Sequence, residues 1–132
     1  NSLRQLFVTK KFKCFRSKIM STLQGSAAED KACKYLMEQG LTLRCRNYHT
    51  RRGELDIVMQ DGSTIVCVEV KYRRRNQFGS ALEFVTAKKL QRIQAAFDFY
   101  LLDNGLNPAS TSLRIDVVAI DGDNLQWLKN VG

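Results

Sequence analysis

The chain has 132 residues, of which 44% are hydrophobic and 26% charged. This composition indicates a globular domain with its own core and excludes an intrinsically disordered chain. No run of about 18 apolar residues occurs, so no transmembrane helix is expected. The net charge of +8 comes from 21 basic and 13 acidic residues, but six of the basic residues lie in residues 1–22, which contain no acid. Overall charge therefore does not predict nucleic-acid binding by the rest of the chain.

The chain divides into an extension, residues 1–24, and a single domain, residues 25–132. The extension combines scattered aromatic side chains with lysines and arginines. It lacks the continuous apolar segment of a secretory signal. We interpret it as a disordered or non-native tail, with a basic arm for nucleic acid or membrane as the alternative.

The first expected element is a helix that starts at Ser26, because Ser26 and Glu29 have the spacing of a capping box, and Gly40 supplies its end. Alternating and β-branched residues predict strands over 41–48, 54–60, 64–71, 113–120 and around 125–127. A second capping box, Ser80–Glu83, predicts the start of a long helix that ends at Asn104-Gly105. The order α-β-β-β-α-β-β predicts an α/β fold: a mixed sheet with flanking helices.

Asp61-Gly62 predicts a two-residue hairpin loop between the second and third strands. With that loop, Glu54 is expected opposite Glu69, and Asp56 diagonal to Glu69 on the same face. Lys71 lies one step beyond Glu69. Three carboxylates and one lysine are therefore predicted to converge at the end of the hairpin that lies far from its turn.

Acids placed opposite each other destabilise a sheet, so this cluster has two interpretations. In the first, Glu54, Asp56 and Glu69 bind a divalent cation such as Mg²⁺, which takes oxygen ligands and needs only one or two carboxylates. In the second, the acids form an exposed rim that Lys71 and nearby arginines neutralise. Spacing supports both equally. Glu29 lies on the side of the first helix expected to face the sheet, and its alternative role is the capping box.

Basic residues precede and follow the acids along the chain. Such residues around acidic strand ends fit a phosphodiester partner, because a metal would contact one phosphate and the basic groups its neighbours. The alternative for each basic residue is that it is simply exposed to solvent on the surface. The candidates for nucleic-acid binding are Arg46, Arg51, Arg52, Arg73, Arg74, Arg75, Lys88 and Arg92.

The segments Gly53–Val58 (GELDIV) and Val68–Arg73 (VEVKYR) resemble the YraN-like family of small bacterial proteins. Phe78-Gly79 and Lys88 fit the same pattern, and the likeness covers about residues 25–120. That family is similar to the PD-(D/E)XK nuclease superfamily, including its Holliday junction resolvases. The resemblance implies the αβββαβ core of restriction endonucleases. Leu55 stands where the superfamily motif has proline.

The resemblance also implies residue roles. Asp56 would be the motif aspartate, Glu69 and Lys71 the E-x-K pair, and Glu29 the acid of the first helix. Mg²⁺ or Mn²⁺ would be held by Asp56, Glu69 and Glu29, together with Glu54. Lys71 would position the attacking water or neutralise the phosphate. The expected activity is endonucleolytic hydrolysis of DNA, branched DNA included, with RNA less favoured.

Two other functions compete with the enzyme. One is a catalytically silent nucleic-acid-binding module that keeps the nuclease fold, and the other is an interaction domain whose acids form salt bridges. No membrane partner is expected. A homodimer fits the resemblance, because resolvase-like relatives often dimerise. Four cysteines without a C-x-x-C pair fit reduced thiols and thus a cytoplasmic location.

Overall fold

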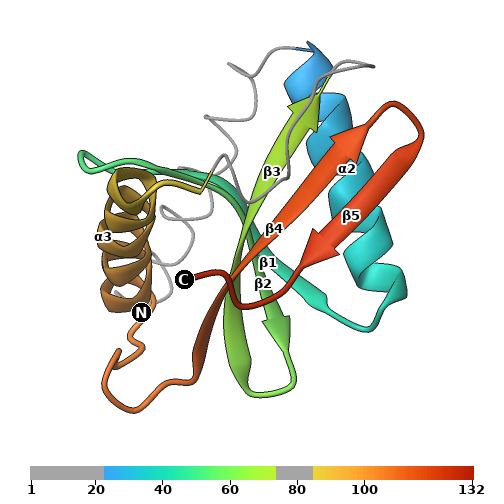
Figure 1. Ribbon diagram of the computed structural model, residues 1–132. Coiled ribbons are helices and arrows are strands. Elements are labelled where there is room, and N and C mark those ends of the chain that lie inside the picture. Colours follow the sequence, from blue (N-terminus) through green and yellow to red (C-terminus); the bar gives the residue numbers. More distant parts are fainter. Residues whose placement is uncertain (1–22, 74–84) are drawn as a thin grey trace.

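Figure 1 shows the computed structural model, which describes residues 23–73 and 85–132. Its helices and strands follow in the order α2 (Leu23–Glu38), β1 (Thr42–His49), β2 (Glu54–Asp61), β3 (Thr64–Arg73), α3 (Ala87–Asp103), β4 (Leu113–Asp121) and β5 (Asn124–Leu128). This order confirms the predicted α/β class, with a mixed sheet, flanking helices and the αβββαβ succession of a nuclease-like core. Neither of these two helices is long and apolar enough to span a membrane.

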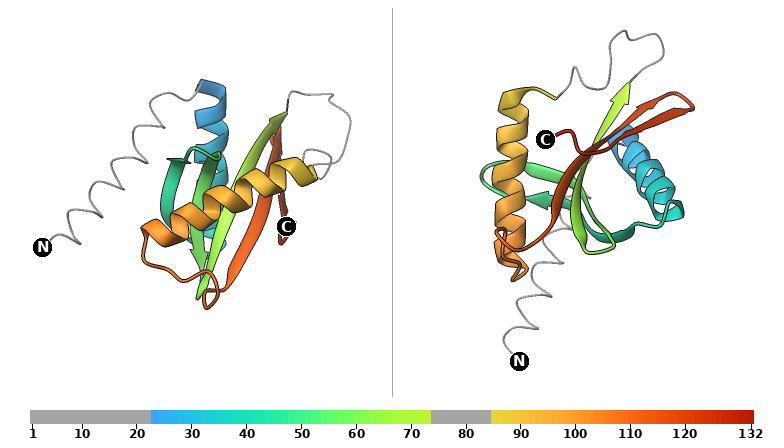
Figure 2. Two further views of the ribbon diagram at one scale, coloured as in Figure 1. Left: turned by 90° about the vertical axis from the view of Figure 1, so that its left-hand side faces the viewer. Right: turned by 60° about the horizontal axis from the view of Figure 1, so that its bottom comes forward.

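The five strands form one sheet in the order β1-β2-β3-β4-β5. Strands β3 and β4 are parallel, and the other neighbouring pairs are antiparallel. A parallel pair needs a long crossover connection, which α3 provides here. Helix α2 covers one face of the sheet and α3 covers the other (Figure 2).

Each helix seals its own hydrophobic core against the sheet. Against α2, the sheet contributes Ile57, Met59, Val66 and Val68; against α3, it contributes Leu55, Val58, Ile65 and Cys67, among others. The free thiols of Cys33 and Cys67 are buried in these two cores. Because both faces of the central strands are covered, any charged group that remains between the layers is removed from bulk water.

The predicted hairpin loop is wrong by one residue. Asp61 remains in β2 and pairs with Thr64, so the loop is Gly62-Ser63. Gly62 has a φ of 62°, the left-handed conformation that a tight hairpin requires and that glycine adopts without a steric penalty. Ile57 consequently pairs with Val68, and the register differs by two residues from the predicted one.

That shift changes how the acids meet. Glu54 is not opposite Glu69, as was expected. The pairing of β2 with β3 ends at Ile57 and Val68, and Asp56 and Glu69 are the next residues of the two strands. The two acids still meet, because each acts on the pKa of the other.

Both predicted helix starts are also wrong. Helix α2 begins at Leu23, so Ser26 lies within it and is not its N-cap. Helix α3 begins at Ala87, after the N-cap Thr86, whose side chain accepts a hydrogen bond from the Lys89 backbone amide. The Ser80–Glu83 box lies outside the described residues. The predicted end at Asn104 is confirmed, because Asn104 is the C-cap.

The alternation of side chains breaks in both β1 and β2. Cys45 and Tyr48 are three residues apart and yet pack in the same α3-side core, as do Leu55 and Val58. Residues three apart in a regular strand face opposite sides of the sheet. The pairing of β1 with β2 shifts register between Leu43 and Cys45, and Asn47, which lies between Cys45 and Tyr48, has a left-handed φ of 54°. An irregularity of this kind re-aims side chains within a sheet.

Candidate active site

Four acids form the candidate site, and they come from three elements of the fold. Glu29 lies on α2, Glu54 and Asp56 at the beginning of β2, and Glu69 near the end of β3. Glu29 and Glu69 are each only 9% exposed, although a carboxylate is normally found in water. Each acid has its pKa raised by burial, and the charge of another acid of the group raises it further. The four acids that the sequence singled out therefore influence one another electrostatically; we call them the acid cluster.

Asp56 and Glu69 are the most tightly linked members of the acid cluster. The Val70 backbone amide donates a hydrogen bond of 2.9 Å to Asp56 Oδ2, which fixes that carboxylate beside β3. Burial and the charge of Asp56 together raise the pKa of Glu69 to about 8. Two carboxylates this close cannot both ionise at low cost, so near neutral pH the pair retains a proton unless a cation replaces it.

The acid cluster differs from the other buried acid of the described fold. Asp116 is fully buried on β4, but its oxygens accept hydrogen bonds from the Arg114 guanidinium, Trp127 Nε1 and the Asn130 backbone amide. It is a satisfied structural group that ties the C-terminal residues to the sheet. Glu29 Oε1 and Glu69 Oε2, by contrast, are buried and find no hydrogen-bond donor among the described residues. A buried oxygen without a donor is costly, so its retention calls for a functional explanation.

Glu29 of α2 faces Arg46 of β1. Arg46 Nη2 is 3.6 Å from Glu29 Oε1, and Arg46 also pairs with Asp30. Burial raises the pKa of Glu29, the charge of Asp56 raises it further, and the Asn47 amide and Arg46 lower it. The interpretation of Glu29 as a partner in a capping box is therefore wrong, because its carboxylate faces the sheet rather than the end of its own helix.

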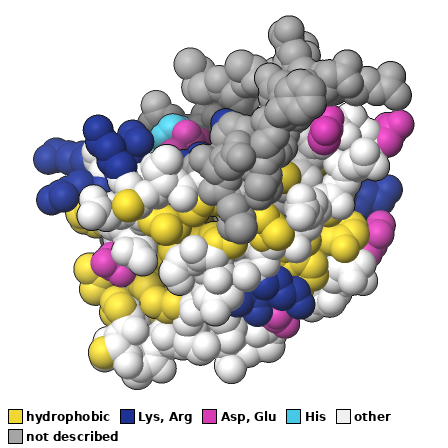
Figure 3. Space-filling view, in the orientation of Figure 1, with side chains coloured by type: hydrophobic (Ala, Val, Ile, Leu, Met, Phe, Trp, Pro, Cys, Tyr) yellow, Lys and Arg dark blue, Asp and Glu magenta, His cyan; other side chains and the backbone are white. Residues whose placement is uncertain are grey.

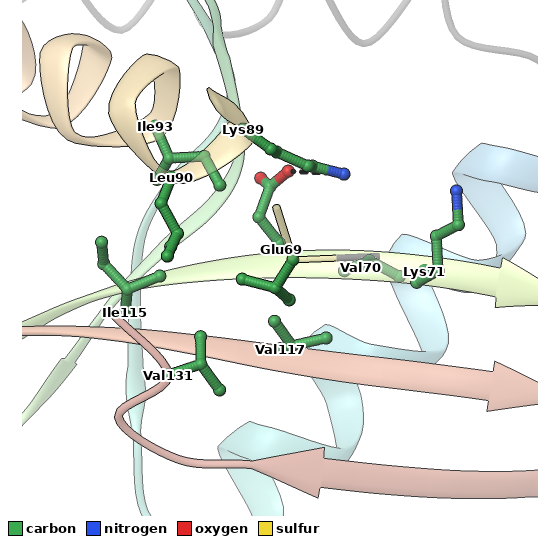
Figure 4. A pocket seen from close by; sticks show the side chains of 10 residues that line it. Glu69, Val70, Lys71, Lys89, Leu90, Ile93, Ile115, Val117 and Val131 are labelled. Carbon is green, nitrogen blue, oxygen red and sulfur yellow. Dashed lines mark ion pairs between the residues drawn. The ribbon is translucent and has the colours of Figure 1, made fainter. Parts of the chain in front are cut away.

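Two lysines accompany Glu69 on the same side of the sheet. Lys89 of α3 reaches Glu69 Oε1 with its Nζ at 3.7 Å, and Lys71 stands two residues along β3 from Glu69 (Figure 4). These three residues, with mainly apolar neighbours, line a cavity of about 10 Å³, which is roughly the space that one water molecule occupies. Lys89 was missed as a site residue by sequence reasoning, because it reads as one of several solvated helix lysines.

The predicted basic residues lie in different places. Arg51 and Arg52 are exposed in the loop between β1 and β2. In this loop the side-chain oxygen of Thr50 accepts hydrogen bonds from the backbone amides of Arg52 and Gly53. Lysine and arginine side chains gather at the edge where this loop crosses α3 (Figure 3), and the loop approaches the α3 backbone where Gly53 meets Arg92. Lys88 and Arg92 are exposed on α3.

Arg46 does not belong to this exposed group, because its guanidinium pairs with Glu29 and Asp30. Arg73 ends β3, whereas Arg74 and Arg75 lie outside the described residues, as do Phe78 and Gly79.

The acid cluster can be tested for its fit to a divalent cation. Within residues 23–73 and 85–132, no three histidine, cysteine or acidic side chains converge closely enough to form a complete ligand set. Mg²⁺ does not need one, since it keeps several waters and is commonly held by one or two carboxylates. Asp56 and Glu69 supply such a pair of carboxylates, and Glu69 Oε2 has no hydrogen-bond partner among the described residues. The chemistry of these donors therefore suits Mg²⁺ or Mn²⁺.

The fold and the site define an α/β protein with a mixed sheet and four electrostatically coupled acids, of which Glu69 pairs with Lys89. The chain belongs to the uncharacterised protein family UPF0102, whose profile matches residues 28–120. This confirms the resemblance to the YraN-like family.

The relatives span most of the chain. A UPF0102 protein of Colwellia psychrerythraea is 46% identical over 114 residues, which cover 83% of this chain and 88% of the relative. One from Vibrio cholerae is 45% identical and covers 85% and 93% of the two chains. One from Neisseria gonorrhoeae is 39% identical over 109 residues, covering 82% and 93%.

Proposed function

We propose that this protein is an endonuclease that uses Mg²⁺ or Mn²⁺ to hydrolyse phosphodiester bonds in DNA, branched DNA included. The observation that carries the proposal is the Asp56–Glu69 pair, with one orphaned buried oxygen and a raised pKa at Glu69. A divalent cation would remove the repulsion between the two acids. The αβββαβ order and the E-x-K spacing of Glu69 and Lys71 support the same function.

The roles of the residues follow from their positions. Asp56 and Glu69 would hold the cation, and Glu29 and Glu54 would add negative charge around it. When bound, the cation would lower the pKa of a water and stabilise the charge that develops on the phosphate. Lys71 would orient the attacking water or contact a phosphate oxygen, from the same side of the sheet as Glu69. The exposed Arg51, Arg52, Lys88 and Arg92 would contact flanking phosphates, and their contribution would weaken as salt rises.

A panel of DNAs tests this function. Four-way junctions, flaps, duplexes and single strands are incubated with the protein and Mg²⁺ or Mn²⁺, with Glu69→Ala and metal-free reactions as controls. We expect strand cleavage that needs both the metal and Glu69. Absence of cleavage from every substrate, or equal cleavage by Glu69→Ala, would contradict the proposal.

The second candidate is a nucleic-acid-binding module without turnover. Two ion pairs favour it: Lys89 with Glu69, and Arg46 with Glu29, which partly neutralise the acid cluster without any metal. This function predicts salt-sensitive DNA binding that is independent of metal. The panel separates the two, because the module would bind the substrates and leave them intact.

Lys89 supplies a further prediction. Its ammonium competes with a cation for Glu69, so Lys89→Gln should strengthen Mn²⁺ binding, by about three- to tenfold given the partial exposure of the pair. Lys88→Gln is the matched control, because Lys88 is the adjacent residue and its side chain is exposed. Calorimetric Mn²⁺ titrations of the two variants measure the effect. Weaker binding by Lys89→Gln than by Lys88→Gln would show that Lys89 does not compete.

A further inference from the structure

Asn47 is an unusual residue for its position in β1. It is only 1% exposed, and neither its Oδ1 nor its Nδ2 makes a hydrogen bond of normal geometry within the described residues. Its φ of 54° lies in the left-handed region, which asparagine tolerates better than other non-glycine residues but still at a cost. A strained backbone combined with an unsatisfied buried amide is a combination that persists where function requires it.

The strand register places Asn47 against the acid cluster. Arg46 pairs with Ile57 and Tyr48 with Leu55, so Asn47 stands opposite Asp56. The left-handed turn lets Tyr48 pack toward α3, while Arg46 reaches Glu29 on α2. Asn47 thus lies beside Asp56 of the acid cluster, at a left-handed residue of β1.

The unsatisfied buried atoms of the described fold gather around this point. Besides both amide atoms of Asn47, they are Glu29 Oε1, Glu69 Oε2, and Nε and Nη2 of Arg46. Donors and acceptors are both present. Arg46 and the Asn47 amide act on Glu29, but none of these atoms makes a hydrogen bond of normal distance and angle within the described residues. Such a set is satisfied by a small group that both donates and accepts, and water is the simplest such group.

We propose that Asn47 and Glu29 form an outer-sphere arm of the cation site, in which the carboxamide and the carboxylate hold a water of the cation that Asp56 and Glu69 bind. This inference rests on the proposed function, because it requires a cation at the Asp56–Glu69 pair. It accounts for the lack of three converging ligands among the described residues, since Mg²⁺ and Mn²⁺ retain water that outer partners orient. Asn47 is accordingly a positioning residue, not a catalytic one.

The test compares two asparagines in the same backbone conformation. Asn47→Gly keeps the left-handed backbone and removes the amide, and Asn130→Gly does the same at the exposed Asn130, whose φ is 57°. Loss of an outer-sphere partner typically weakens metal binding by about 10–100-fold. We therefore expect calorimetry to show Mn²⁺ binding weakened at least tenfold by Asn47→Gly and unchanged by Asn130→Gly.

Glu29→Gln provides a second route that does not depend on Asn47→Gly folding. It should weaken Mn²⁺ binding to a similar extent without abolishing it, and adding Asn47→Gly to it should cause little further loss, because both groups act on one water. Independent, multiplying losses, or Mn²⁺ binding by Asn47→Gly that equals wild type, would overturn the outer-sphere arm alone. Failure of the wild-type protein to bind Mn²⁺ would overturn the proposed function as well.

Discussion

Asp56→Asn is expected to reduce metal-dependent DNA cleavage by about a thousandfold or more, because it removes charge from a group that would hold the cation and leaves the shape of the side chain unchanged. The Asn47–Asp56–Glu69 neighbourhood should keep its geometry, since the carboxamide oxygen can still accept the hydrogen bond that the Val70 amide donates at 2.9 Å. Single-turnover cleavage assays at saturating protein measure the loss.

The control for Asp56→Asn is Asp98→Asn, on the exposed side of α3. It makes the same chemical change far from the acid cluster, and its cleavage rate should match that of the wild type. Circular dichroism should show both variants folded. Wild-type cleavage by a folded Asp56→Asn protein would remove Asp56 from the site.

Glu69→Gln is expected to stabilise the metal-free protein. The pKa of Glu69 is about 8 in the folded protein and near its ordinary value of 4.5 in the unfolded chain. The folded state therefore binds more protons between these values, and the wild-type protein loses stability as pH rises from about 4.5 to 8. Glutamine removes this loss, so the advantage of the variant should grow over the same pH range, to on the order of 2 kcal/mol.

Urea unfolding at pH 5 and pH 8.5 in the presence of a chelator measures this advantage. Glu38→Gln, an exposed acid at the end of α2, is the control and should show little change at either pH. A Glu69→Gln protein that is less stable than wild type at pH 8.5 would mean that Glu69 contributes to the fold. A site that costs stability and is retained is instead typical of function.

Much of the architecture could be predicted because it depends on local patterns. β-branched runs fixed the strands of the sheet, and Asn104 marked the end of α3. The predicted helix starts were wrong because a capping box is only a spacing of two residue types. Helix α2 continues N-terminally beyond Ser26, and α3 is capped by Thr86 instead.

Only part of the candidate site could be predicted from the sequence. Asp56 and Glu69 lie on neighbouring strands and each affects the pKa of the other, and the charge of Asp56 also acts on Glu29. Among the described residues, no three such side chains form a complete ligand set. The register that brings Asp56 next to Glu69 was not foreseen, because the turn uses Gly62 as its first residue.

Lys89 and Asn47 were missed for different reasons. Lys89 meets Glu69 only through the packing of α3 on the sheet, which no local pattern in the sequence reports. Asn47 carried a signal that could have been used: asparagine is disfavoured within strands, and one in the middle of an alternating strand indicates an irregular backbone.

The central claim is that Asp56 and Glu69 bind a divalent cation together. A calorimetric titration of the metal-free protein with Mn²⁺ at pH 7.5, with Glu69→Gln alongside, tests it most directly. We predict saturable binding by the wild type, accompanied by proton release as the cation displaces the shared proton, and loss of both signals in Glu69→Gln. Equal binding by the two proteins, or no binding by the wild type, would contradict the claim.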